Sequence, residues 1–245
     1  PGTNGTASNP TGSTTPGTPG SDSGERDGSG GINDYADSGS GTVSVESVAV
    51  TKAVIATSEA ETGSSEFRPG VPDLVIGESA TFEINVTIPE GSTPQVVITD
   101  TVPFSNGVMR VDSASVVSVG ANLSPVVPSP VPAISDTQMA DGIDDTVSFD
   151  FGQVDNTPDN AVTFNDQIIV RVVATLVDET ANVNDDDLTN GVLVQFGPGL
   201  DASASADIDV VEPILSVDKS GSITQGDAGD SVTYTVTLEH TGGSS

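Results

Sequence analysis

Short runs in which apolar and polar residues alternate fill most of the chain from residue 43 onward. The clearest run is residues 79–89, where Ala80, Phe82 and Ile84 are separated by threonine and glutamate. Alternate side chains of a strand point to opposite faces, so this period of two predicts one buried and one solvated face. Similar runs predict strands at residues 42–55, 94–103, 107–119, 145–154, 166–177 and 188–197, and residues 203–213 predict either another strand or the lead into a linker.

The number of strands and the residues between them indicate the fold class. Residues 166–177, DQIIVRVVATLV, form a near-continuous apolar run that is typical of a central strand. Residues 89–92, PEGS, predict a turn, and the proline-rich residues 124–132 exclude regular structure. Seven or eight short strands separated by turns predict an all-β fold, an immunoglobulin-like two-sheet β-sandwich.

The pattern divides the chain into three parts. Residues 1–42 are mostly Gly, Ser, Thr and Pro and bury too little apolar area to offset their chain entropy, so we expect a disordered linker. Residues 43–212 are predicted to form the sandwich. The pattern then restarts, because ILSVDKSG and GDSVTYTVTLEHTGG parallel the earlier SVAVTKAV and GESATFEINVTIPEG. Residues 213–245 therefore predict the first two strands of a second, incomplete repeat, or donor strands that complete another subunit.

Composition narrows the classes of function. The chain has 36 acidic and six basic residues, a formal charge of −30, which disfavours nucleic acid and anionic membrane surfaces and favours divalent cations as partners. It has no cysteine for a disulfide or a thiolate metal site, and no run of about 18 apolar residues that predicts membrane insertion. Its single histidine, His240, lies near the end, so no Ser-His-Asp constellation is available. We expect a protein that is not an enzyme.

The two lysines of the chain stand in unusual positions. Lys52 lies an even number of positions from Val48, Val50 and Val54, a relation that is called shared parity below. Lys219 has the same relation to Leu215 and Val217 in LSVDKSG. On a strand, each lysine would therefore point to the same face as its apolar neighbours.

The motifs around these lysines resemble the β-sandwich repeats of bacterial surface proteins, whose modules combine a lysine strand with Gly-Asp-x-Val-Thr-Tyr and Asp-Thr-Leu-Pro. They also resemble the related fimbrial isopeptide-forming domain of Gram-positive pilins. The matching segments are GDSVTYTVTLEHTGG at 229–243, GESATFEINVTIPEG at 77–91, TDTVP at 99–103 and TNGVLV at 189–194. The sequence departs from the pattern at Val102, where the family has leucine, and at His240, where it often has asparagine.

The resemblance implies a cross-linking triad of Lys52, Asn190 and Asp100. In the isopeptide-forming relatives, a first-strand lysine joins a last-strand asparagine with the help of a buried acid. Parity is an independent check, because Asn190 and Asp100 also share the faces of apolar neighbours. Burial lowers the pKa of a lysine and raises that of an acid, as this chemistry requires. Glu83 is an alternative acid, but its parity with Thr81 points it outward.

A simpler interpretation of Lys52 stays open. Its stem can pack on the sandwich while its ammonium group reaches Asp100 or the acidic surface as an ordinary ion pair.

Acidic loops offer oxygen ligands for calcium. The residues of the loop before Asn190 are the candidates, although their spacing fits no EF-hand, and a solvated acidic loop is the alternative. The candidate ligands are Asp178, Glu179, Asp185, Asp186 and Asp187.

These observations predict a non-enzymatic stalk or filament module of a secreted bacterial surface protein, located outside the cell or on its surface. Its expected partners are copies of itself or adjacent repeats of a longer chain. The alternative is an adhesin domain, with or without calcium, that binds a receptor, a sugar or ice.

Overall fold

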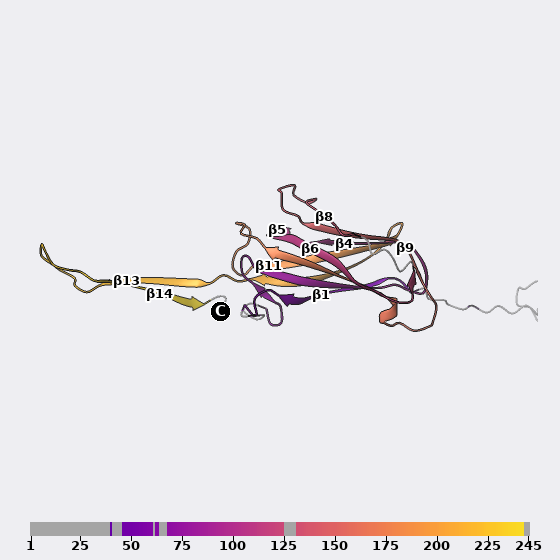
Figure 1. Cartoon of the computed structure of the whole chain (residues 1–245), viewed down its shortest axis with the longest axis horizontal. Coiled ribbons are helices and arrows are strands. Elements are labelled where there is room, and N and C mark those ends of the chain that lie inside the picture. The colour runs from indigo at the N-terminus through magenta and orange to yellow at the C-terminus, as the bar shows by residue number, and fades with distance from the viewer. Residues whose placement is uncertain (1–39, 41–45, 61, 64–67, 125–130, 243–245) are drawn as a thin grey trace, which may run out of the picture. The chain divides into compact units, whose positions relative to one another are not determined.

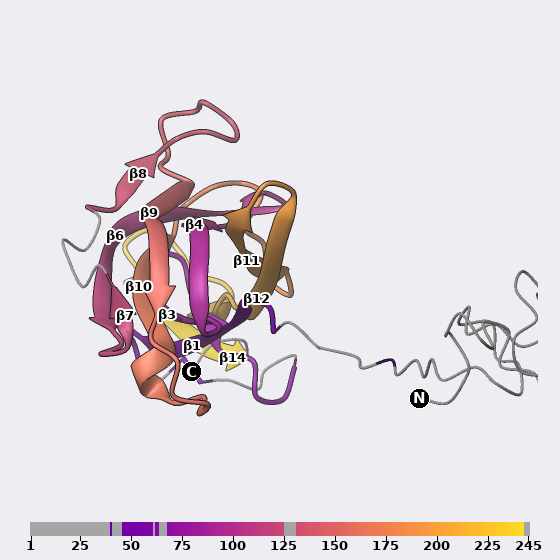
Figure 2. The same ribbon diagram turned by 90° about the vertical axis from the view of Figure 1, so that its right-hand side faces the viewer.

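The computed structural model describes residues 40, 46–60, 62–63, 68–124 and 131–242. Its β-strands form two sheets over residues 49–210 and a separate two-stranded sheet beyond them (Figure 1). Figure 2 looks nearly along the strands and shows the two larger sheets as two layers. The prediction of an all-β two-sheet sandwich is therefore confirmed. The linker predicted at residues 1–42 lies outside the described residues except for residue 40.

The first sheet contains five strands in the order β1-β3-β10-β6-β5, and its long strands pair antiparallel. The predicted central strand is confirmed, because β10 lies in the middle of this order. The strands are β1 (Ala49–Thr57), β3 (Ser79–Thr87), β10 (Gln167–Leu176), β6 (Gly107–Val119) and β5 (Phe104–Ser105).

The second sheet has the order β2-β12-β11-β4-β9-β7, and β8 also pairs with β9. A 3-10 helix, η1 (Phe164–Asp166), leads into β10 of the first sheet. The strands are β2 (Asp73–Leu74), β12 (Leu200–Val210), β11 (Asp187–Gly197), β4 (Gly91–Thr101), β9 (Thr146–Asn156), β7 (Leu123–Ser124) and β8 (Ala133–Ser135).

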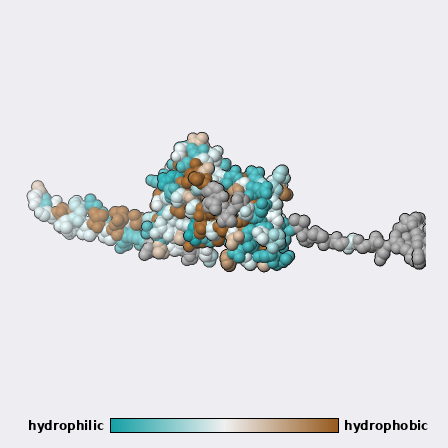
Figure 3. Space-filling view, turned by 45° about the vertical axis from the view of Figure 1, so that its right-hand side comes forward, coloured by the Kyte–Doolittle hydropathy of each residue, from teal (hydrophilic) through white to brown (hydrophobic). Residues whose placement is uncertain are grey.

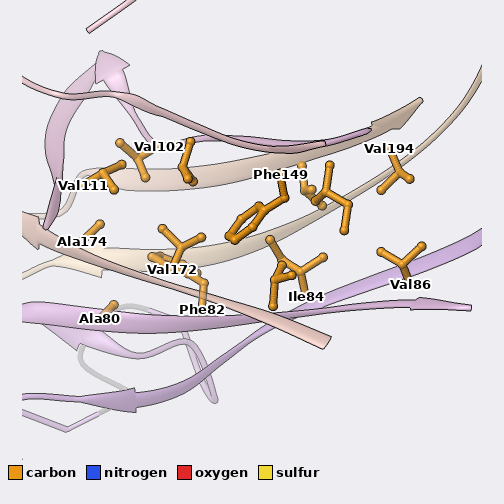
Figure 4. Packing of buried hydrophobic residues seen from close by; sticks show 14 of the residues in the cluster. Ala80, Phe82, Ile84, Val86, Val102, Val111, Phe149, Val172, Ala174 and Val194 are labelled. Carbon is orange, nitrogen blue, oxygen red and sulfur yellow. The ribbon is translucent and has the colours of Figure 1, made fainter. Parts of the chain in front are cut away.

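The core lies between these two sheets. In β3 every second residue is buried, as its alternating sequence requires. Side chains from both sheets fill the space, and Figure 4 shows Phe149 of β9 meeting Ile84 of β3 there. Phe82 and Phe149 are the largest side chains of this core and are fully buried.

The boundaries of several predicted strands are wrong, and residues 203–213, which predicted either a strand or the lead into a linker, lie mostly in the strand β12 (Leu200–Val210). The strand β1 begins at Ala49, so residues 46–48 of the first predicted run lie outside it, and the earlier part of that run lies outside the described residues. The turn predicted at residues 89–92 is shorter, because β4 already begins at Gly91, where φ is +104°. Pro94 lies inside β4, at an irregularity in its pairing with β9 between Thr93 and Val96. A residue without an N–H group is tolerated at such a position.

The third sheet is an antiparallel hairpin of β13 (Ile214–Gly221) and β14 (Tyr234–Gly242). Its described residues are exposed along both strands. No helix in the described part of the chain is long and apolar enough to cross a membrane.

Candidate cross-link site

Lys52 points into the core from the first sheet. It lies in β1, where it pairs with Ile84 of β3, and its neighbours Val50 and Val54 pack against the core from the same face. The Lys52 side chain is 0% exposed. A solvent-reaching lysine is therefore excluded, because the ammonium group ends inside the sandwich.

Asp100 and Asn190 lie side by side in the second sheet. Asp100 of β4 pairs with Val192 of β11, so Asn190 is two residues along β11 from the partner of Asp100. Diagonal neighbours of this kind are within reach on the same face of a sheet. Both residues are 0% exposed.

The two sheets meet at this point through an ion pair. Lys52 Nζ contacts Asp100 Oδ2, and the Asp100 side chain is also 0% exposed. The ring centroid of Phe82 lies 5.1 Å from Lys52 Nζ, so the cation also faces an aromatic ring. The side chains of Lys52 and Asp100 therefore join strands from opposite layers.

Asn190 is poorly satisfied in its buried position. Its amide is close enough to Asp100 to favour the ionised acid, yet neither its nitrogen nor its oxygen makes a hydrogen bond of normal geometry. Among the described residues, Asn190 is the one side-chain amide whose nitrogen and oxygen are both buried without a hydrogen-bond partner. Buried polar atoms without partners are costly, so a structural or chemical role is needed to explain them.

Burial moves both pKa values toward neutral side chains. Desolvation lowers the pKa of Lys52 from 10.5 to about 8, although the charge of Asp100 and its hydrogen bond act in the opposite direction. Desolvation raises the pKa of Asp100, against the charge and hydrogen bond of Lys52 and the nearby amide of Asn190, which lower it. A shared proton can therefore sit on either partner at lower cost than in water.

The alternative acid, Glu83, lies on the solvent side of β3. Its carboxylate accepts hydrogen bonds from Arg171 Nε and Nη2, at 2.9 and 2.7 Å. Glu83 therefore takes no part in the buried site.

The predicted calcium ligands do not come together as one site. Asp186 Oδ2 accepts a hydrogen bond from the Val183 amide at 2.8 Å, and Asp187 Oδ1 lies 3.1 Å from Arg68 Nε. Within the described ranges, no group of three or more His, Cys, Asp or Glu residues is arranged to hold a metal ion. Calcium binding by the five predicted residues, Asp178, Glu179, Asp185, Asp186 and Asp187, stays a prediction.

A second polar cluster, which was not predicted, lies on the outer face of the second sheet. Asp73, Asp209 and Asp187 lie in one row across β2, β12 and β11. Arg68 covers this row, and its Nε lies 2.6 Å from Asp209 Oδ1. Adjacent like charges in a row are unfavourable, so the arginine supplies the compensating charge.

One cleft of about 280 Å³ opens beside this row. The threonine hydroxyl groups at 101 and 189 and the carboxylate of Asp187 contribute polar atoms to its lining.

The fold and site define a two-sheet β-sandwich whose layers meet at a buried lysine, acid and amide. No family profile matches the chain, and a search of curated proteins gives no match.

Several solved structures have a similar arrangement of strands. The major pilin subunit BcpA of Bacillus cereus is 12% identical, with a TM-score of 0.39 over 71% of this chain and 42% of that one. The C-terminal domain of the Streptococcus agalactiae AgI/II polypeptide BspA is 14% identical, with a TM-score of 0.43 over 77% and 60%. The pilus backbone RrgB of Streptococcus pneumoniae is 12% identical, with a TM-score of 0.36 over 62% and 32%. The chain thus spans less than two thirds of the length of each of these proteins.

Proposed function

We propose that the chain is a non-enzymatic structural module of an extracellular bacterial surface protein, with its two sheets joined by an isopeptide bond between Lys52 and Asn190. The observation that supports the bond is the fully buried Lys52–Asp100 pair beside an amide that lacks well-formed hydrogen bonds. Removing the Asn190 nitrogen as ammonia would relieve one of its two unsatisfied atoms.

The residues at the site suit one round of acyl transfer. Transfer of the shared proton from Lys52 to Asp100 leaves a neutral amine and a protonated acid. The amine nitrogen attacks Asn190 Cγ, while the acid polarises the amide carbonyl. The C–N bond to the amide nitrogen then breaks, and the nitrogen leaves as an ammonium ion with the two protons that Lys52 gives up, the first of which passes through Asp100. The Asp100 carboxyl group ends unchanged, so no external reactant is consumed.

The bond would stabilise the module more than an ion pair can. It would close a loop of about 140 residues, and a cross-link over such a span is worth about 5 kcal/mol by chain entropy. It would also tie the edge strand β1 of one sheet to the interior strand β11 of the other. Force applied through the two ends of the chain would pass through this bond and bypass the residues between, which suits a stalk or filament. The partners in this proposal are copies of the module or adjacent repeats.

Single-molecule extension tests the mechanical role. In the wild-type chain the residues between Lys52 and Asn190 should stay locked, whereas in Lys52→Met they should be released and lengthen the fully extended chain by about 50 nm. Lys219→Met is the matched control and should extend like the wild type. Equal extension of the wild type and Lys52→Met would contradict the proposal.

A further inference from the structure

The hairpin β13–β14 repeats the register of β1 and β3. Lys219 pairs with Val236 as Lys52 pairs with Ile84. In both hairpins an aromatic residue lies two positions before the partner of the lysine, Tyr234 in one and Phe82 in the other. Lys219 Nζ lies 4.4 Å from the ring centroid of Tyr234, compared with 5.1 Å for the first pair. The likeness therefore extends from sequence to side-chain geometry.

One face of this hairpin is apolar. Directly paired residues of antiparallel strands share a face, so Val217 and Leu238 lie on the same side as Lys219 and Val236. The opposite side presents serine, threonine and the acids Asp218 and Glu239. Val217 and Leu238 are 68% and 63% exposed, and Figure 3 shows brown apolar side chains along this part of the chain.

In the sandwich of residues 49–210, the apolar face that bears a lysine is covered by a second sheet with an acid. The face of β1 and β3 that bears Lys52 is covered by the second sheet, which supplies the carboxylate of Asp100. The face that bears Lys219 has no cover within the described residues, and a hairpin with an open apolar face is marginal in water.

A second copy of the hairpin does not fit on this apolar face, because its charges are not complementary. Packing two of these apolar faces together would bury Lys219 from each copy, with His240 beside Leu215 at the end of the face. Neither face would contribute a carboxylate, since Asp218 and Glu239 point to the other side. A buried ammonium group without a partner is costly, so the cover has to bring an acid.

We propose that the apolar face of β13–β14, defined by Leu215, Val217, Lys219, Val236 and Leu238, binds a β-sheet of a neighbouring repeat module. The apolar side of that sheet carries one aspartate or glutamate, which forms a buried ion pair with Lys219. The two layers then make a second sandwich built on the plan of the first. This inference stands apart from the Lys52–Asn190 bond, because it needs no covalent step.

Lysine labelling and zero-length cross-linking test the inference. In the purified 245-residue chain, Lys219 should react readily with an amine-specific acylating reagent. On intact surface assemblies from the producing cells, its labelling should fall at least tenfold. A carbodiimide should then join Lys219 to an acid within an alternating apolar segment that lies outside this sequence.

A lysine on the polar face provides the matched control. Thr237→Lys, in the same hairpin, should label equally in both preparations. Any other pattern overturns the inference, including unchanged labelling of Lys219, a link only to Asp218 or Glu239, or a link to an acid of a second copy. None of these outcomes bears on the mass or extension of the wild-type module, so the two proposals fail independently.

Discussion

Lys52 and Asp100 form an ion pair to which solvent has no access, with the lysine on the edge strand of one sheet and the acid within the other. Burying two charges is costly, and only their close contact offsets the loss of water. The pair therefore makes each residue dependent on the other.

Replacing the acid alone should be strongly destabilising. Asp100→Asn leaves Lys52 buried without a counter-charge, and breaking a buried pair in this way costs about 3 to 5 kcal/mol. The comparison belongs in an Asn190→Ala background, where no cross-link can form. Urea denaturation gives the free energy of unfolding of each variant.

The double replacement is the control for this prediction. Lys52→Met together with Asp100→Leu should recover most of the lost stability, because no buried charge remains. A cost below about 1 kcal/mol for Asp100→Asn would mean that the pair is reached by water.

The lowered pKa of Lys52 predicts that the free energy of unfolding increases with pH in the alkaline range. In the Asn190→Ala variant, the folded chain loses its proton near pH 8, whereas the unfolded chain keeps it until 10.5. The unfolded state then binds more protons, so the free energy of unfolding should rise across this window, by about 3 kcal/mol at most. The raised pKa of Asp100 has the opposite sign, because it lowers the free energy of unfolding as the pH rises above 3.8.

Denaturation at several pH values between 7 and 10.5 measures this rise. The double variant Asn190→Ala/Lys52→Met removes the group and should show little change over the same range. A flat profile in Asn190→Ala itself would show that Lys52 titrates as a solvated amine.

Replacing Arg68 should lower the free energy of unfolding more than replacing the other surface arginines. Its removal in Arg68→Met leaves the row of Asp73, Asp209 and Asp187 without its arginine, and we expect a loss of about 2 to 3 kcal/mol. Asp209→Asn in the same chain should restore part of it. Arg171→Met breaks only the exposed pair with Glu83 and should cost less than about 1 kcal/mol. Equal losses for the two arginine variants, in urea denaturation, would contradict the role assigned to Arg68.

Alternation along the chain was enough to predict most of the sandwich and the faces of its candidate site. Lys52, Asp100 and Asn190 each share parity with apolar residues, and each is buried. Parity cannot say which strands lie opposite one another, because this depends on the order of strands and the packing of the two sheets. The contact between Lys52 and Asp100 was therefore predicted from the resemblance to isopeptide-forming domains and not from parity.

The acidic row shows a second limit. Asp73 lies in a two-residue strand that is too short to have a pattern, and it pairs in parallel with Asp209, 136 positions further on. Arg68 precedes a turn and has no local sequence feature that links it to this row. Long-range pairing of short segments leaves no period in the sequence, so the cluster could not be predicted.

The covalent bond between Lys52 and Asn190 is the central claim, and the intact mass of the purified chain tests it most directly. Formation of the bond releases one ammonia, so the wild type should be about 17 Da lighter than its sequence, and Lys52→Met and Asp100→Ala should not show the loss. Asn190 precedes Gly191, and ring closure at an Asn-Gly pair would also release ammonia, but it would persist in Lys52→Met. Lys219→Met should keep the loss. A wild type at its full sequence mass, or a loss that survives in Lys52→Met, would contradict the account.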